Sequence, residues 1–123
     1  MNIEDIYTNY ALNDGKIISL QLDYKLKKLI VTLQVRRLLA KDKFEPCTIE
    51  LEFLNVNEVN YFEDFPTNGG YTDITFLKLE DSIFYLSLDP NGNSGLPNAE
   101  DNLVIKGEML TLIDESAVRH SIK

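Results

Sequence analysis

The chain has 123 residues, a length that fits one domain of ordinary size. Apolar residues make up 44% of the chain and charged residues 26%, which excludes a disordered polymer, a collagen-like fibre and a disulfide scaffold. Twenty acidic residues against twelve basic ones give a formal net charge of −8, which disfavours binding to the phosphate backbone of a nucleic acid.

The first predicted elements are a short helix followed by three strands. Near the N-terminus, Ile3 and Ile6 begin a helical spacing of apolar residues, and a turn signal follows at 13–15. Strict alternation of apolar and polar residues then predicts strands over 17–24 and 28–36, which are close enough to form a hairpin. After a polar break at 41–43, a third strand is expected from Cys47 to Phe53.

The second half of the chain contains three further predicted strands. Residues 54–65 lose the alternation, and their apolar spacing predicts a helical turn or a packed loop. Strands are expected over 71–79 and 82–88, joined by a tight turn, and the second is apolar on nearly both faces, which indicates a central, covered strand. The last strand, over 103–113, contains Gly107, which we interpret as the mark of a bulge, and residues 114–123 are expected to be a polar tail or at most a short helix.

These elements predict one domain over residues 1–123, either all-β or β-rich α+β. It would contain about six mainly antiparallel strands and one or two short helical turns. A flat sheet would expose a row of Leu, Ile and Val side chains, so a sandwich or a strongly twisted sheet is expected.

The residues that most often carry out catalysis are scarce. The only histidine, His120, falls on the predicted tail, where it cannot be held against a nucleophile. The only cysteine, Cys47, is expected on the inward face of its strand, where burial raises the pKa of the thiol. We therefore expect no catalytic residues, no enzyme activity and no cofactor.

Acidic and aromatic residues suggest a protein-binding surface. Glu50 and Glu52 share one face of a predicted strand, although alternating acids are also typical of a solvated strand face. Aromatic residues beside acids after this strand fit an interface anchor for a basic partner, or alternatively a corner of the core. The predicted partner-binding residues are Glu50, Glu52, Glu58, Tyr61, Phe62, Glu63 and Asp64.

The long loop after the fifth predicted strand offers a second kind of site. Over residues 89–100, side-chain oxygens occupy positions 1, 3, 5 and 12 of a twelve-residue segment: Asp89, Asn91, Asn93 and Glu100. This segment resembles an EF-hand loop, which implies a calcium site. It departs from that pattern at position 6, where Ser94 replaces glycine, and its predicted flanks are strands. The alternative is a connecting loop whose residues serve turn geometry.

Charge is segregated along the chain. Residues 25–43 carry seven bases and one acid, whereas residues 44–103 carry twelve acids and one base. Either these are two ordinary solvated faces, or the acidic segment forms a docking surface. We expect a cytoplasmic protein, since the sequence has no apolar signal segment and no cysteine pair.

The function that fits these observations is a small acidic protein-binding module, such as an immunity-type protein that neutralises a basic toxin or enzyme. Its expected partner is a protein with a basic surface, and we expect neither a nucleic acid nor a membrane as a partner. The alternatives are a self-associating accessory or structural domain, and a β domain that binds calcium or another small ligand.

Overall fold

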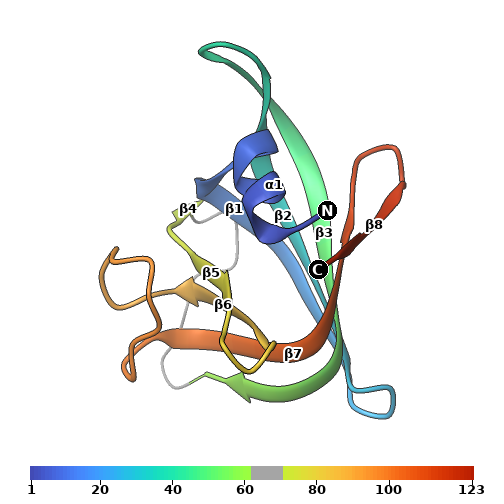
Figure 1. The fold of residues 1–123 in the computed structure, drawn as a ribbon, viewed down its shortest axis with the longest axis vertical. Coiled ribbons are helices and arrows are strands. Elements are labelled where there is room, and N and C mark those ends of the chain that lie inside the picture. Colours follow the sequence, from blue (N-terminus) through green and yellow to red (C-terminus); the bar gives the residue numbers. More distant parts are fainter. Residues whose placement is uncertain (62–70) are drawn as a thin grey trace.

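The computed structural model describes residues 1–61 and 71–123. These residues form one curled antiparallel sheet and one short helix (Figure 1). The elements in chain order are α1 (Ile3–Asn9), β1 (Tyr10–Asp23), β2 (Lys28–Ala40), β3 (Lys43–Asn60), β4 (Tyr71–Thr72), β5 (Thr75–Lys78), β6 (Phe84–Asp89), β7 (Asn102–Ile113) and β8 (Arg119–Ile122). The strand order is β4-β1-β2-β3-β7-β6-β5, and β8 pairs with β7 off this path. The predicted β-rich antiparallel fold is confirmed, in the form of a strongly twisted sheet.

Strands β1, β2 and β3 form a meander in which alternate side chains enter the core. Leu33 in the middle of β2 lies between Ile17 of β1 and Ile49 of β3, and all three are almost fully buried. The strands are longer than predicted because the β2–β3 turn is confined to two residues, with Asp42 in the left-handed region at φ 61°. The alternation predicted for 28–36 and 47–53 is confirmed by the burial pattern, except at Glu52, which is buried although it lies on the face opposite the core.

Two segments predicted to lie outside the strands contain bulges within them. The turn signal at 13–15 lies inside β1, where the register shifts between Ala11 and Lys16 and Asp14 has φ 62°. The helical turn or packed loop predicted from residue 54 is wrong as far as Asn60, because β3 continues through this segment. Asn55 at φ 50° and a register shift between Val56 and Glu58 disturb the alternation that marks a strand.

The second half of the sheet is built on β7. Its first part pairs with β6 and its last four residues pair with β8, while β3 runs along the other edge. Strand β6 is buried from Phe84 to Leu88 on both faces, as predicted. The predicted strand over 71–79 is divided, because β4 pairs with β1 whereas β5 pairs with β6. Gly107 itself is regular, and the irregularity lies opposite it in β3.

The C-terminal residues are not a tail. The carboxylate of Asp114 accepts hydrogen bonds from the N–H groups of Ser116 (2.9 Å) and Val118 (3.0 Å), and the chain turns back to form β8. Ile122 is buried in the core, and the N–H of Lys123 donates to the carbonyl of Met1 at 2.9 Å. The prediction of a polar tail over 114–123 was therefore wrong. The turn is held by hydrogen bonds to a polar side chain, so the apolar pattern of the sequence gives almost no sign of it.

Helix α1 closes the open side of the curled sheet (Figure 1). The side chain of Asn2 and that of Asp5 form a capping box, and Ile3 and Ile6 enter the core, which confirms the predicted helix. The sheet thus buries its apolar row by curling and by adding this helix. Among the described residues, no helix has the length and apolar character required to cross a membrane.

Candidate functional site

Glu52 lies on the face of the sheet opposite the core, where it forms part of the fold. Its side chain is only 5% exposed, and its carboxylate oxygens lie 3.3 Å from Nζ of Lys28 and 2.6 Å from Nη2 of Arg119. These cations come from β2 and β8, so the ion pairs cross the sheet. Because the carboxylate is buried and already paired with two cations, Glu52 is removed from the predicted partner-binding residues.

The other predicted partner-binding residues are placed differently. Glu50 is half-buried on the same face as Glu52. Glu58 is exposed, and its Oε2 lies 3.1 Å from Nζ of Lys106 on β7. Tyr61 is 52% exposed. Phe62, Glu63 and Asp64 lie outside the described residues, so their role remains a prediction.

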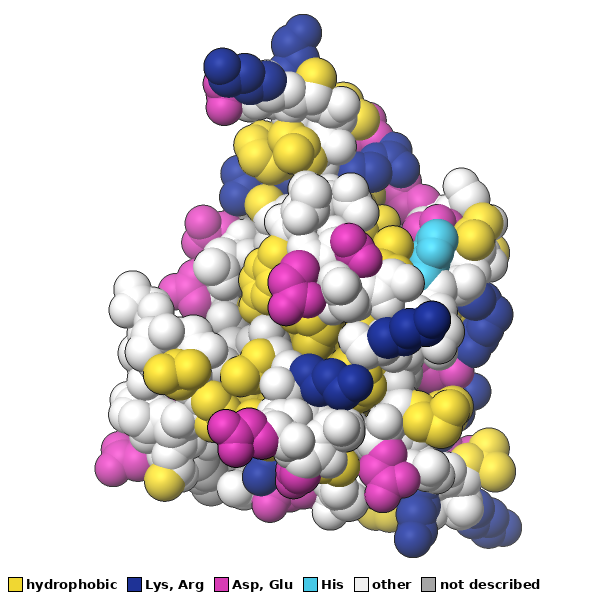
Figure 2. Space-filling view, viewed as in Figure 1, with side chains coloured by type: hydrophobic (Ala, Val, Ile, Leu, Met, Phe, Trp, Pro, Cys, Tyr) yellow, Lys and Arg dark blue, Asp and Glu magenta, His cyan; other side chains and the backbone are white. Residues whose placement is uncertain are grey.

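The charge segregation of the sequence is partly lost in space. Several acids of the 44–103 segment pair with bases from other strands, as Glu52, Glu58 and Glu45 do with Lys28, Lys106 and Arg37 respectively. On the face shown in Figure 2, acidic side chains are scattered, whereas Lys and Arg gather over the β2–β3 turn at the top and the β1–β2 turn at the lower right. The described acids therefore form no single acidic face in this view.

A patch of exposed apolar side chains lies beside the β1–β2 turn. We call it the turn patch; it consists of Leu22, Tyr24, Leu26 and Val59, which are 36%, 85%, 66% and 42% exposed. Leu22, Tyr24 and Val59 line a hollow of about 320 Å³, together with Lys27 and residues 56–58. Sequence reasoning missed the turn residues, although large apolar side chains inside a short charged turn were an available signal.

Local hydrogen bonds hold this turn in place. The Oδ1 atom of Asp23 accepts from the N–H groups of Lys25 (3.0 Å) and Leu26 (3.1 Å), and Lys27 has φ 49°. The carbonyl of Lys27 accepts from the N–H of Val56 at 2.9 Å, which ties the turn to the bulged part of β3. The exposed side chains of the turn patch therefore stand on an ordered backbone.

The loop between β6 and β7 is organised by Asp101. This carboxylate is almost fully buried, and it accepts hydrogen bonds from the N–H groups of Asn91 (2.7 Å) and Asn98 (3.0 Å) and from the hydroxyl of Tyr85. Burial, followed by the hydrogen bond with Asp101, raises the pKa of Tyr85. Tyr85 thus remains a neutral donor, and the loop is fixed over the face of β6 that the core does not cover.

The predicted calcium ligands lie in this loop but belong to different contacts. The carboxylate of Asp89 accepts from the side-chain amide of Asn102 at 3.1 Å, and Asn91, Asn93 and Glu100 are exposed. Within residues 1–61 and 71–123, no group of three or more His, Cys, Asp or Glu side chains is arranged to hold a metal ion. Asp101, which sequence reasoning did not select, is the carboxylate that closes the loop. Calcium binding by Asp89, Asn91, Asn93 and Glu100 remains a prediction.

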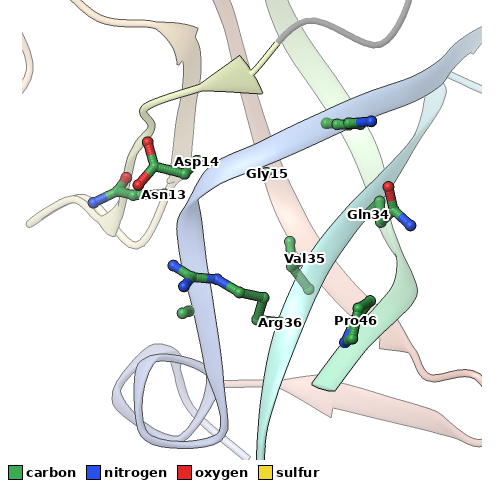
Figure 3. Close-up of a pocket in the computed structure, with 9 residues that line it drawn as sticks. Asn13, Asp14, Gly15, Gln34, Val35, Arg36 and Pro46 are labelled. Carbon is green, nitrogen blue, oxygen red and sulfur yellow. The ribbon is translucent and has the colours of Figure 1, made fainter. Parts of the chain in front are cut away.

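Two hollows flank the bulge in β1. The first, of about 220 Å³, is lined by Ala11 and residues 13–16 of β1, residues 34–36 of β2 and Pro46, and its polar side chains point apart (Figure 3). Gly15 is required at its floor, because a Cβ there would lie 2.7 Å from the carbonyl oxygen of Gln34. The second, of about 470 Å³, is lined by Tyr7, Asn13, Phe76 and residues of two loops. In the first hollow, diverging polar groups do not form the converging set that small-molecule sites use.

Cys47 and His120 have structural positions. Cys47 is buried in the core as predicted, and its burial, assisted by Glu115 and Glu45, raises the pKa of the thiol. His120 lies on β8 with Nε2 3.0 Å from Oδ2 of Asp114. That contact, followed by the backbone donor of Val118, lowers the pKa of Asp114.

We compared the chain with protein-family models, with curated proteins and with solved structures, and none of the three comparisons gave a match.

Proposed function

We propose that this protein is a non-enzymatic protein-binding module that acts in the cytoplasm and engages its partner through the turn patch. The observation that carries the proposal is the exposure of Leu22, Tyr24 and Val59 around one hollow, beside an ordered turn that also exposes Leu26. Exposed apolar groups that surround a hollow and are bordered by charged residues are typical of protein interfaces.

The proposed partner has a basic surface. The chain carries a net charge of −8, which attracts a cationic protein over distances of about a Debye length and raises the rate of encounter. Glu58 lines the same hollow as Tyr24 and Val59, but its carboxylate is paired with Lys106 and Lys27 lines the hollow too. The attraction of a basic partner therefore comes from the net charge of the whole chain and not from the turn patch itself. An immunity-type protein, which neutralises a basic toxin or enzyme by covering it, would have these properties.

The test is capture of the partner from the lysate of the native cell by immobilised protein. Two matched variants distinguish binding through the turn patch from non-specific hydrophobic binding. Leu26 and Leu96 are similarly exposed, at 66% and 63%, but they lie in different loops. We expect Leu26→Ser to lose the captured protein and Leu96→Ser to retain it. We also expect capture to weaken as the salt concentration rises.

Four results would contradict the proposal. Equal capture by both leucine variants would remove the turn patch as the contact surface. An acidic captured protein, or binding that is unchanged between low and high salt, would remove the electrostatic part of the argument. A mass by light scattering that doubles with concentration, and a dimer that Leu26→Ser disrupts, would favour self-association instead.

A further inference from the structure

The β2–β3 hairpin extends beyond the rest of the sheet. The last residue pair between β1 and β2 at this end is Tyr10 with Arg37, and β7 pairs with β3 only from Glu50 onward. Beyond these points, residues 38–44 pair only with one another in the described part of the chain. At about 3.3 Å per residue, the hairpin projects roughly 10–13 Å past the end of β1 (Figure 1).

Large apolar side chains are exposed on this projecting segment. We call residues 36–45 the hairpin end. Leu38, Leu39 and Phe44 are 39%, 56% and 47% exposed, although a two-stranded ribbon gains little stability in water. Leu38 and Phe44 are directly paired across the two strands, so they share one face. These side chains add little to the core, and their exposure indicates a contact surface.

The hairpin end is also a cationic part of an acidic molecule, as is the β1–β2 turn with Lys25, Lys27 and Lys28. It contains Arg36, Arg37, Lys41 and Lys43 against Asp42 and Glu45, a formal charge of +2, which leaves −10 on the rest of the chain because the whole chain carries −8. Arg37 pairs with Glu45, and the guanidinium of Arg36 lies 5.4 Å from the centroid of the Phe44 ring. Figure 2 shows this cationic group at the top of the molecule, beside apolar side chains.

We propose that the hairpin end docks on an anionic lipid surface, with Leu38, Leu39 and Phe44 entering the interface and Lys41 and Lys43 contacting lipid headgroups. Charge complementarity favours a lipid surface as the ligand, because the cytoplasmic leaflet of a membrane is negative and attracts clustered Lys and Arg side chains. A projecting apolar tip enters a lipid interface without a preformed cavity, which a protein partner would have to provide. The projection also keeps the acidic body about one Debye length, roughly 8 Å, from the headgroups.

This mode of binding differs from the one that the sequence excluded. The sequence predicted no membrane partner, and its longest uninterrupted apolar runs are only a few residues, too short to span a bilayer. Peripheral docking requires no spanning segment. The proposal does not depend on the turn patch, which lies at the other end of β2.

The direct test is flotation with vesicles of phosphatidylcholine alone and of phosphatidylcholine mixed with phosphatidylserine. We expect binding only to the mixed vesicles, and weaker binding at high salt. Substituting Lys41→Glu together with Lys43→Glu should reduce binding by at least about fivefold for each cation removed. Phe44→Ser should reduce it by about tenfold, because a buried aromatic side chain is lost from the interface.

The turn patch supplies matched controls. Lys25→Glu together with Lys27→Glu, and Leu26→Ser, change the same kinds of side chain at the opposite end of β2 and should leave vesicle binding intact. The same Leu26→Ser variant is expected to lose the protein partner, so failure of one proposal is distinguishable from failure of the other. Thermal unfolding of each variant verifies that the fold is retained.

A spectroscopic measurement locates the contact. The chain has no tryptophan, so Phe44→Trp introduces a single tryptophan, which can be excited selectively over the six tyrosines. Its emission should shift to shorter wavelength on the mixed vesicles, whereas Tyr24→Trp should not shift. The proposal is overturned if the wild-type protein does not float, or if control and hairpin variants lose binding equally. Binding to soluble polyglutamate without binding to vesicles would also overturn it and would indicate an acidic protein as the ligand.

Discussion

Arg119 on β8 donates a hydrogen bond of 2.6 Å from Nη2 to Oε1 of Glu52 on β3, across 67 positions of sequence. The same carboxylate also meets Lys28 of β2. These contacts compensate the burial of a carboxylate on the face of the sheet that the core does not use. They also attach the C-terminal strand to the central meander.

Glu52→Gln should lower the free energy of unfolding by about 2 kcal/mol, since it removes the buried negative charge that pairs with Lys28 and Arg119. Glu58→Gln is the control, because the Glu58–Lys106 pair is much more exposed and its loss should cost about 0.5 kcal/mol. Urea unfolding measures both values. Equal losses in the two variants would contradict the structural role of Glu52.

Asp101→Asn should release the loop between β6 and β7. The substitution keeps the shape of the side chain but replaces one acceptor oxygen with an NH₂ group, which faces N–H or O–H donors. We expect a loss of about 2 kcal/mol and faster proteolysis within residues 91–98. The exposed neighbour provides a control, since Glu100→Gln should change neither quantity. Unchanged cleavage in Asp101→Asn would show that another contact closes the loop.

Gly15→Ala should destabilise the β1 bulge by about 2 kcal/mol, because its Cβ would meet backbone atoms that cannot move away. Those atoms are the carbonyl oxygens of Gln34 and Leu12, at 2.7 and 3.1 Å. Gly107→Ala is less crowded, with its nearest atom at 3.2 Å, and should cost less. Thermal unfolding of the two variants gives the comparison, and the reverse ranking would be inconsistent with the bulge geometry.

The Asp114 carboxylate should contribute to acid sensitivity. Its pKa is lowered from 3.8, first by the hydrogen bond with His120 and then by the N–H of Val118. Its stabilising effect is therefore present above the ordinary pKa and is lost as the pH falls through the lower folded value. Wild type should be more stable than Asp114→Asn at about pH 6, and the difference should shrink by about pH 2.5. A constant difference across this range would exclude the effect.

The regular strands were predictable because each buries one face. Alternation in 28–36 and 47–53 reflects the concave side of the sheet, and β6 was recognised as covered on both faces. The bulges could not be predicted in the same way. Asp14 and Asn55 have left-handed backbone conformations, and Asp and Asn adopt these both in turns that end a strand and in bulges that bend one.

The candidate site was less predictable because contacts between residues far apart in the sequence determine which side chains are exposed. Glu50 and Glu52 look equivalent on one strand face, yet Lys28 and Arg119 bury the second from positions far along the chain. The turn patch likewise depends on Val59 reaching a turn formed by residues 24–27. Sequence reasoning selected acidic and aromatic residues as interface candidates, but it had no means of pairing distant segments.

Strand β2 separates the two exposed ends of the molecule. Its thirteen residues, at about 3.3 Å each, hold the β1–β2 turn and the β2–β3 turn roughly 40 Å apart. Since β1 and β3 flank this strand, the separation is maintained by a continuous sheet. A molecule bound at one end would therefore be held at a fixed distance from anything bound at the other end. Energy transfer between dyes attached at Leu26→Cys and Leu39→Cys can measure this distance.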